Sequence, residues 1–169
     1  MSAPTSRPNA NKCEVREPVK LVHNDYTPTS APQRVRDLLP DEAEALLETR
    51  FVFINVWMPI CGPVQTAPKT VCDARSIGKD DLIATDLKYD NRTGEVCQST
   101  HNPDHCWIYF PLMERDEALL VKCYDSREDG RAGFTAHTAF RDPTTPPDAP
   151  GRQRIEVRTI AFFSDQTRL

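Results

Sequence analysis

Prolines divide this chain into short segments, and that division limits what it can fold into. The 169 residues include 15 prolines and only 6 glycines, so many connections between segments are long and stiff. The runs between them are rich in β-branched and aromatic residues, and the clearest strand is FVFINVW (51–57), which Pro59 and Gly62-Pro63 end. Residues 59–70 and 141–151 are expected to be extended loops.

Few segments carry a helical pattern. A helix is expected over 41–49, where Pro40 precedes a capping Asp41 and apolar residues form a stripe. ERDEALL (114–120) predicts a single helical turn. The remaining expected strands are 71–76, 82–89, 94–100, 107–110, 119–126 and 154–164.

Many short strands with few helices predict a mainly β fold, a sandwich or a double-stranded β-helix (jelly roll) with one or two short helices. A parallel α/β fold is disfavoured because almost no helices separate the strands. Residues 1–17 are polar and unpatterned, so we expect a loose tail before one domain over 18–169.

Charge and hydropathy argue against several classes of partner. The net charge is −4 and the Lys and Arg residues are scattered, which is unlike a nucleic-acid-binding stripe or a membrane-surface patch. No apolar run approaches the roughly 20 residues that span a bilayer, and MSAPTSRPNANK contains no hydrophobic signal segment. We therefore expect a cytoplasmic protein that binds neither nucleic acid nor membrane.

The cysteines favour reduced thiols over a disulfide framework or a zinc site. No CxxC or CxxxC pair occurs, and the spacing is irregular. We expect mostly buried, reduced side chains at all six positions: Cys13, Cys61, Cys72, Cys97, Cys106 and Cys123.

The tripeptide His23-Asn24-Asp25 is the first candidate for chemistry. In a strand, residues i and i+2 point to the same side, so the imidazole and the carboxylate can converge on one point. With one more histidine they would form the facial triad that binds Fe(II) and leaves coordination positions open. The alternative is a surface turn in which a histidine stands beside a capping aspartate.

Three other histidines could supply the third ligand. His101 and His105 lie in the turn-like THNPDHC segment, where a histidine is typically solvated or capping. His137 lies between Phe134 and Phe140, an apolar setting that favours a neutral imidazole. A half-buried core histidine is the alternative interpretation of His137.

Several blocks resemble one family in their order along the chain. They are VHNDYT, RFVFINVWMPI, CDARS, DDLIATDL, DEALLVKCYDS, HTAFRDPTTPPDAP and RIEVRTIAFF. From about Val19 to Phe163 the chain resembles the fungal AsaB-type hydroxylase/desaturases of secondary metabolism, which are similar to cephem-methoxylase partner proteins. The resemblance implies a non-haem Fe(II)/2-oxoglutarate oxidoreductase that hydroxylates or desaturates a small secondary-metabolite intermediate.

The resemblance also implies roles for individual residues. His23, Asp25 and His137 would bind Fe(II) and be the catalytic centre. Arg152 would anchor the distal carboxylate of 2-oxoglutarate through a bidentate contact, with Arg158 as the second choice.

Three expected strands, 154–164, 51–57 and 119–126, supply further residues that could face the site. Arg152, Arg154 and Arg158 share a parity, so they can face one side of a regular strand. Substrate contact is expected from Asn55, Trp57 and Tyr124.

The chain also departs from the family pattern. Members usually carry a long N-terminal region before the VHxD block, and Met58 stands where an arginine is expected. A jelly roll incomplete at its N-terminus would expose an edge or an apolar face to a second copy or a partner chain. The alternatives are a partial, non-catalytic binding protein or subunit, and a metal-dependent isomerase or cyclase without 2-oxoglutarate.

Overall fold

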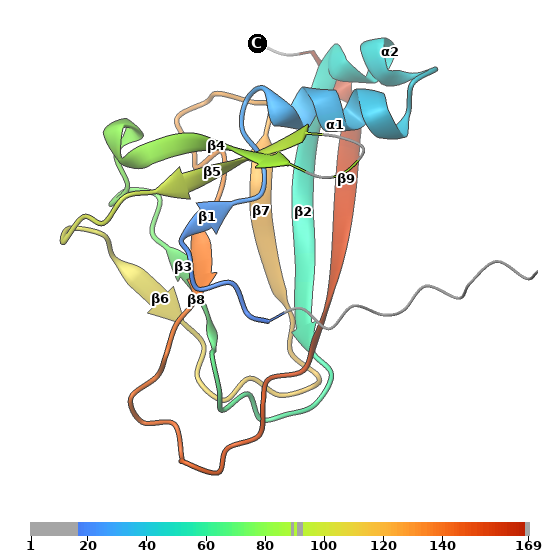
Figure 1. Cartoon of the computed structure of the whole chain (residues 1–169). Helices are drawn as coiled ribbons and strands as arrows, with labels where there is room; N and C mark the ends of the chain where they lie inside the picture. Colours follow the sequence, from blue (N-terminus) through green and yellow to red (C-terminus); the bar gives the residue numbers. More distant parts are fainter. Residues whose placement is uncertain (1–16, 89, 91–92, 168–169) are drawn as a thin grey trace, which may run out of the picture.

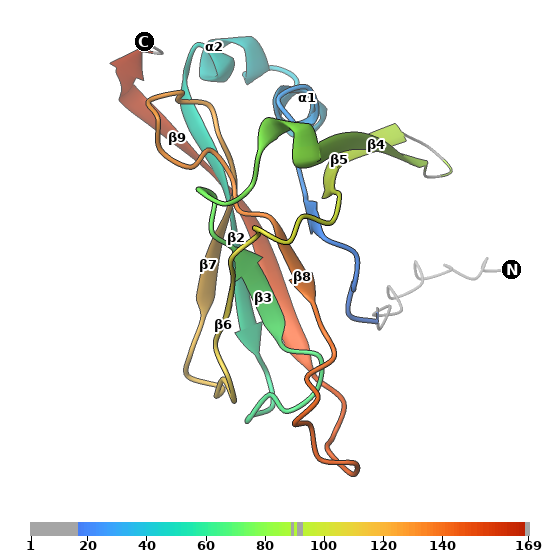
Figure 2. The ribbon, with the colours of Figure 1, turned by 90° about the vertical axis from the view of Figure 1, so that its left-hand side faces the viewer.

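A computed structural model describes residues 17–88, 90 and 93–167 of the chain. The expected tail over 1–17 therefore lies almost entirely outside the described residues. Most of the regular structure is β, and the strands form two antiparallel sheets (Figures 1 and 2). The two helices are α1 (Ser30–Leu38) and α2 (Ala43–Leu47), and a 3₁₀ turn covers Lys79–Asp81.

The larger sheet has six strands in the order β4-β5-β1-β8-β3-β6. The smaller has the order β7-β2-β9. Apart from the β4–β5 hairpin, neighbouring strands are not consecutive in the sequence, so the chain crosses between the sheets as a jelly roll requires. The bounds are β1 His23–Asn24, β2 Thr49–Pro59, β3 Lys69–Cys72, β4 Leu82–Lys88, β5 Thr93–Ser99, β6 Trp107–Tyr109, β7 Leu119–Asp125, β8 His137–Ala139 and β9 Arg154–Thr167.

The central strand β2 contains the expected FVFINVW segment. It pairs with β7 on one side and with β9 on the other. Asn55 and Trp57 are almost fully buried, whereas Val56 between them is only half-buried, as period-2 alternation predicts. One end of the strand packs under α1 and α2, and Figure 1 shows both helices at that end. This apolar cluster comprises Ala31, Val35, Ala43, Leu47, Phe51, Phe53, Val121 and Cys123.

Three local expectations need correction. The expected helix over 41–49 shortens to α2, and α1 was not expected. Pro32 argued against a helix in the sequence. Proline is tolerated in the first turn, however, because the N–H groups of that turn make no hydrogen bond within the helix. The predicted helical turn at 114–120 is a β-turn, in which the Glu117 N–H donates to the Glu114 carbonyl at 3.1 Å. The strand expected over 71–76 ends at Cys72 and continues as a turn.

The cysteines are unpaired wherever the chain is described. Cys13 lies outside the described residues. The expectation of mostly buried side chains is wrong for two positions, which are exposed on loops. All five described thiols are free: Cys72 and Cys123 are buried, Cys97 is half-buried, and Cys61 and Cys106 are exposed.

The outer face of the smaller sheet is apolar. Leu120 and Val157 flank Val56 in register, and their exposed fractions are 72% and 51%. The sequence analysis expects a second copy or a partner chain, which would bury these three side chains. That contact stays a prediction. Among the described residues no helix is long and apolar enough to cross a membrane.

A charged clamp ties β2 to β7 at the helical end. The Arg50 guanidinium donates to both oxygens of Asp125 at 3.0 and 2.8 Å, and Lys122 donates at 3.3 Å. Burial disfavours the charge on Asp125, but the Arg50 bond, the Arg127 N–H and Lys122 outweigh it, lowering the pKa to about 2. The carboxylate is therefore charged in the folded protein at any pH above that value.

This clamp predicts acid sensitivity. Because the pKa of Asp125 is about 2 when folded and 3.8 without the fold, its contribution is complete above about pH 4 and lost as pH falls toward 2. We expect Asp125→Asn to lower the free energy of unfolding by about 2 kcal/mol at neutral pH, with the difference shrinking toward pH 2. Urea unfolding at several pH values measures this, and a pH-independent difference would contradict it.

Candidate functional site

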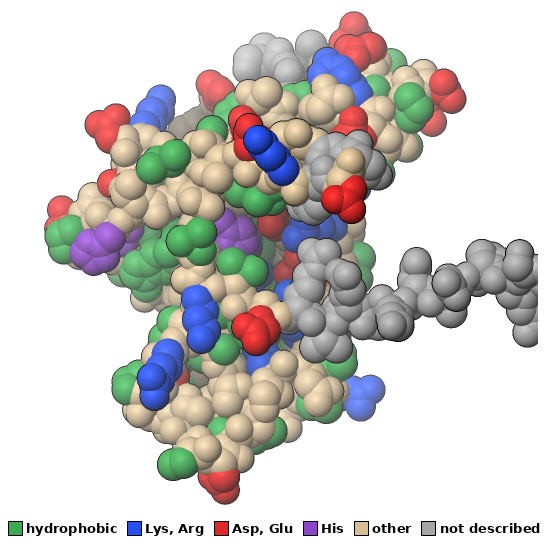
Figure 3. Space-filling model, in the orientation of Figure 1, with side chains coloured by type: hydrophobic (Ala, Val, Ile, Leu, Met, Phe, Trp, Pro, Cys, Tyr) green, Lys and Arg blue, Asp and Glu red, His purple; other side chains and the backbone are tan. Residues whose placement is uncertain are grey.

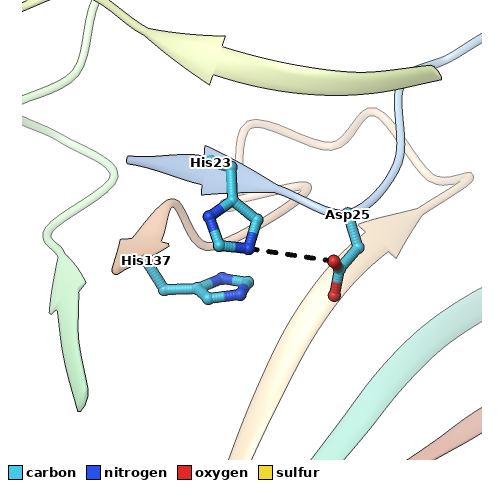
Figure 4. A group of neighbouring side chains, drawn as sticks. All are labelled: His23, Asp25 and His137. Atoms are coloured by element: carbon cyan, nitrogen blue, oxygen red, sulfur yellow. Dashed lines mark ion pairs between the residues drawn. The ribbon is translucent and has the colours of Figure 1, made fainter. Parts of the chain in front are cut away.

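Two strands of the larger sheet place the histidines side by side. β1 and β8 pair so that His23 lies directly opposite His137, and their ring centroids are 4.6 Å apart. Asp25 follows just after β1, with its Oδ1 3.9 Å from His23 Nε2 (Figure 4). One ligand atom from each residue lies within 4.8 Å of the others. The structure therefore brings together the three residues that the sequence predicted.

Backbone carbonyls orient both imidazoles. His23 Nδ1 lies 2.8 Å from the Leu21 carbonyl and His137 Nδ1 lies 3.0 Å from the Thr135 carbonyl, so each Nδ1–H donates to an oxygen. The Nε2 atoms are then left unprotonated and free for a ligand. Such bonds are typical of histidines that bind metals.

The protonation states also suit a metal. Burial, together with the positive charge of Lys69, lowers the pKa of His137 to about 4, so its imidazole is neutral near pH 7. Burial disfavours the charge on Asp25, but Arg158 and the Asn55 hydrogen bond help to keep its pKa below the ordinary value. Neutral imidazoles and one carboxylate are the donor set that fits Fe(II) with open positions.

The two other histidines take no part in this cluster. The Nε2 of His105 lies 3.0 Å from the Asp81 carboxylate, and its side chain is buried. That contact ties the 100–106 loop to the 3₁₀ turn. His101 is exposed. The segment THNPDHC is a turn, as predicted, and His101 is solvated, but the expectation that His105 is solvated or capping is wrong because its side chain is buried against Asp81.

A small cavity of about 110 Å³ adjoins the three residues. Trp57 forms part of its wall, as expected from β2. Arg152, Arg154 and Arg158 all line it, which confirms that they face one side. The recess is visible in Figure 3, where histidine, basic and acidic side chains meet between the upper and lower parts of the molecule.

Arg152 and Arg158 differ in their partners. Arg158 is half exposed, and its guanidinium contacts Asp25 Oδ1 and Glu156 Oε1, each at 3.3 Å. The Arg152 guanidinium lies over the Trp57 ring at 5.4 Å and donates to the Ala67 carbonyl. Its buried Nε has no hydrogen-bond partner among the described residues. Burial, together with the charge of Arg154, lowers the pKa of Arg152 to about 10, so it remains a cation at neutral pH.

Three charged residues of the cavity, Glu17, Lys69 and Glu156, were missed by the sequence analysis. Lys69 is 7% exposed, and its Nζ lies 3.5 Å from Glu156 Oε2. Glu156 shares the parity of the arginines around it, so the same alternation would have found it. Lys69 gave no such signal, because residues 59–70 look like loop and β3 begins only at Lys69.

The three expected substrate contacts lie in different places. Asn55 donates from its Nδ2 to Asp25 Oδ2 at 2.6 Å, so it touches a predicted metal ligand. Trp57 lines the cavity. Tyr124 packs against Phe51 at 5.4 Å between ring centroids, under the helices, and lines neither cavity. The structure does not bring Tyr124 to the site.

A larger groove of about 1070 Å³ opens onto the same residues. His23 and Asp25 line both spaces, so the groove and the small cavity meet at the triad. Its walls come from α1, from the β4–β5 hairpin and from β9, and they include Tyr26, Arg34 and Ile160. Figure 1 shows α1 and the hairpin beside one another above β1.

The chain is similar to several curated proteins of fungal origin. It is 38% identical to aspirochlorine biosynthesis protein N of Aspergillus oryzae over 83% of this chain and 60% of that protein. It is 39% identical to hydroxylase/desaturase asaB of Aspergillus flavus, over 74% and 61%. It is 36% identical to the Fe(II)/2-oxoglutarate-dependent dioxygenase nvfI of Aspergillus novofumigatus, over 94% and 57%. The chain thus spans little more than half the length of these relatives.

A solved structure and a family model agree with these matches. The iron and alpha-ketoglutarate-dependent endoperoxidase NvfI superposes with a TM-score of 0.83 and 34% identity, over 91% of this chain and 57% of that one. The expected jelly roll is thereby confirmed. The model of the oxidoreductase/YMDC permease-like domain matches residues 3–162. The chain therefore belongs to this oxidoreductase family and, within it, to the AsaB-type hydroxylase/desaturases of fungal secondary metabolism.

Proposed function

We propose that this chain carries the catalytic centre of an Fe(II)/2-oxoglutarate-dependent oxygenase that hydroxylates or desaturates a small organic molecule. The observation that carries the proposal is the convergence of His23, Asp25 and His137 at the meeting point of two cavities. The smaller cavity is lined by a half-buried arginine, Arg152, whose Nε has no hydrogen-bond partner among the described residues, and the other is a larger groove. The relatives' names point to the same cofactor and co-substrate.

The protein's own contribution is to hold ligands and to shape the space. His23, Asp25 and His137 would hold the metal, their bonds to backbone and to Asn55 fixing the ring and carboxylate orientations. The chemistry that iron and 2-oxoglutarate supply together is oxidation of a C–H bond by O₂, coupled to decarboxylation of the co-substrate.

Arg152 is the better anchor for the co-substrate carboxylate. Lys69 and Arg158 already have Glu156 as a counter-ion, and Arg158 also contacts Asp25. Arg152 is a half-buried cation with no carboxylate at ion-pair distance among the described residues, and its buried Nε has no hydrogen-bond partner there. A buried charge without a counter-ion costs stability, and an anionic ligand would offset that cost.

The groove suits a substrate larger than 2-oxoglutarate. It combines apolar walls from Phe53 and Ile160 with polar side chains of α1 and the β4–β5 hairpin. A substrate lying there would reach the triad past His23 and Asp25. We therefore place the small-molecule substrate in the groove and 2-oxoglutarate in the inner cavity.

We also propose that the reaction takes place in the cytoplasm. The five described cysteines are free thiols, and Cys61 and Cys106 are exposed to the medium. Exposed thiols persist in a reducing compartment and tend to pair outside it. The absence of a strong basic patch in the composition agrees with a small molecule as the partner.

Loss of a ligand should abolish the metal site. Under anaerobic conditions, Fe(II) and 2-oxoglutarate added to the protein should give the weak charge-transfer absorption of the chelate. We expect His137→Ala to weaken Fe(II) binding by more than about 100-fold, since changes outside the ligand set already cost 10- to 100-fold. The exposed His101→Ala is the matched control and should bind like the parent chain.

Each alternative activity gives a different result when O₂ and candidate substrates are then added to the metal-loaded protein and succinate is measured. Iron binding without succinate formation on any substrate would favour the non-catalytic protein. Conversion of a substrate without succinate release would favour the isomerase or cyclase. A parent chain that binds no Fe(II) would refute the proposal.

The arginines predict a difference in co-substrate affinity. We expect Arg152→Gln to weaken 2-oxoglutarate binding on the order of 100-fold, because a buried charged pair loses one partner. Arg158→Gln should weaken it much less, since Arg158 is half exposed and paired with carboxylates. Calorimetry with the Mn(II)-loaded protein measures both, and a larger loss for Arg158→Gln would reverse the assignment.

A further inference from the structure

Asn55 lies directly behind Asp25. It projects from β2 in the smaller sheet, whereas Asp25 follows β1 in the larger one. Its Nδ2 donates to Asp25 Oδ2 at 2.6 Å and lies 3.5 Å from Glu156 Oε1. The bond to Asp25 therefore joins the two sheets at the metal site.

The two oxygens of Asp25 have different surroundings. Oδ2 accepts the Asn55 bond, and the Cys123 thiol lies 3.6 Å from the same atom. Oδ1 faces the histidines, 3.9 Å from His23 Nε2, with Arg158 at its open side. The carboxylate is thus held from behind through one oxygen and presents the other to the triad.

The buried amide of Asn55 is costly for the fold. The side chain is 1% exposed, and its Oδ1 has no hydrogen-bond partner among the described residues. An apolar residue of similar size would avoid that penalty beside Phe53 and Trp57. Its short bond to a predicted metal ligand gives the amide a purpose other than stability.

We propose that Asn55 is a positioning residue that holds Asp25 so that only Oδ1 can bind the metal. Without the Asn55 donor the carboxylate can rotate and bind through both oxygens. Chelation through both oxygens would occupy a position that the co-substrate or O₂ requires. The inference rests on the proposed metal site and changes the expected role of Asn55 from substrate contact to ligand support.

Asn55→Leu tests the proposal, because it removes the donor while keeping the side chain's size. Metal-free protein of full length would be titrated with Co(II) alone, following affinity and visible absorption, which reports the coordination around Co(II). We expect affinity to fall by about 10- to 100-fold and the spectrum to change, as for other residues that support ligands. The unfolding midpoint of the metal-free variant should equal or exceed that of the parent.

Cys123→Ala is the matched control. The thiol lies near the same oxygen but is a weak donor, so its removal should change the affinity less and leave the spectrum unaltered. If Asn55→Leu fails to fold, Asn55→Ala replaces it, since it only removes atoms.

The outcomes separate this inference from the proposed function. A parent chain that does not bind Co(II) would overturn the metal site and the inference together. Parent-like affinity and spectrum in the Asn55 variant would overturn the inference alone. Equal losses in the Asn55 and Cys123 variants, with lowered unfolding midpoints, would also overturn it, because they would show a general packing effect.

Discussion

A single buried amide, that of Asn24, fixes the geometry on which the site depends. Its Nδ2 donates across the sandwich to the Cys123 carbonyl at 2.8 Å and also to the Tyr26 carbonyl. β1 has only two residues, so its few ladder bonds to β5 and β8 would hold it weakly. The cross-sheet bond supplies the missing restraint, and His23 consequently keeps its place opposite His137. The middle residue of the HND tripeptide thus holds the strand from which its neighbours project.

The charges of the inner cavity are arranged around a surplus of cations. Four basic and three acidic side chains line it, and one of the acidic ones, Asp25, belongs to the triad. Glu156 lies between Lys69 and Arg158 and compensates both in part. Arg152 forms no ion pair at contact distance among the described residues, and its guanidinium lies over the Trp57 ring. A metal cation would add to this surplus, so the cavity is electrostatically complete only with an anion of more than one charge.

The sequence predicted those features that follow from local patterns. The strand around Asn55, the histidines and aspartate of the triad, and the shared face of the last strand's arginines all follow from period-2 alternation and residue chemistry. Tyr124 could not be placed in this way, because a register shift between Phe53 and Ile54 breaks the alternation along β7. Lys69 was not predicted as a site residue because β3 is short and follows a long loop. Only its pairing with distant strands makes this segment a strand.

The supports of the triad and of the groove are built differently. The candidate metal ligands and Arg152 lie on or beside strands β1, β8 and β9, which neighbouring strands restrain through hydrogen bonds. The groove's outer walls come from α1 and the β4–β5 hairpin, which lie at one end and one edge of the sheets (Figure 2). Substitutions in α1 and in β4, neither of which pairs with β1, can change the shape and charge of the groove without breaking the strand pairing that holds His23. Substitutions in β5 can affect both the groove and the triad, because β5 pairs with β1 and Gln98, which lines the groove, lies opposite His23.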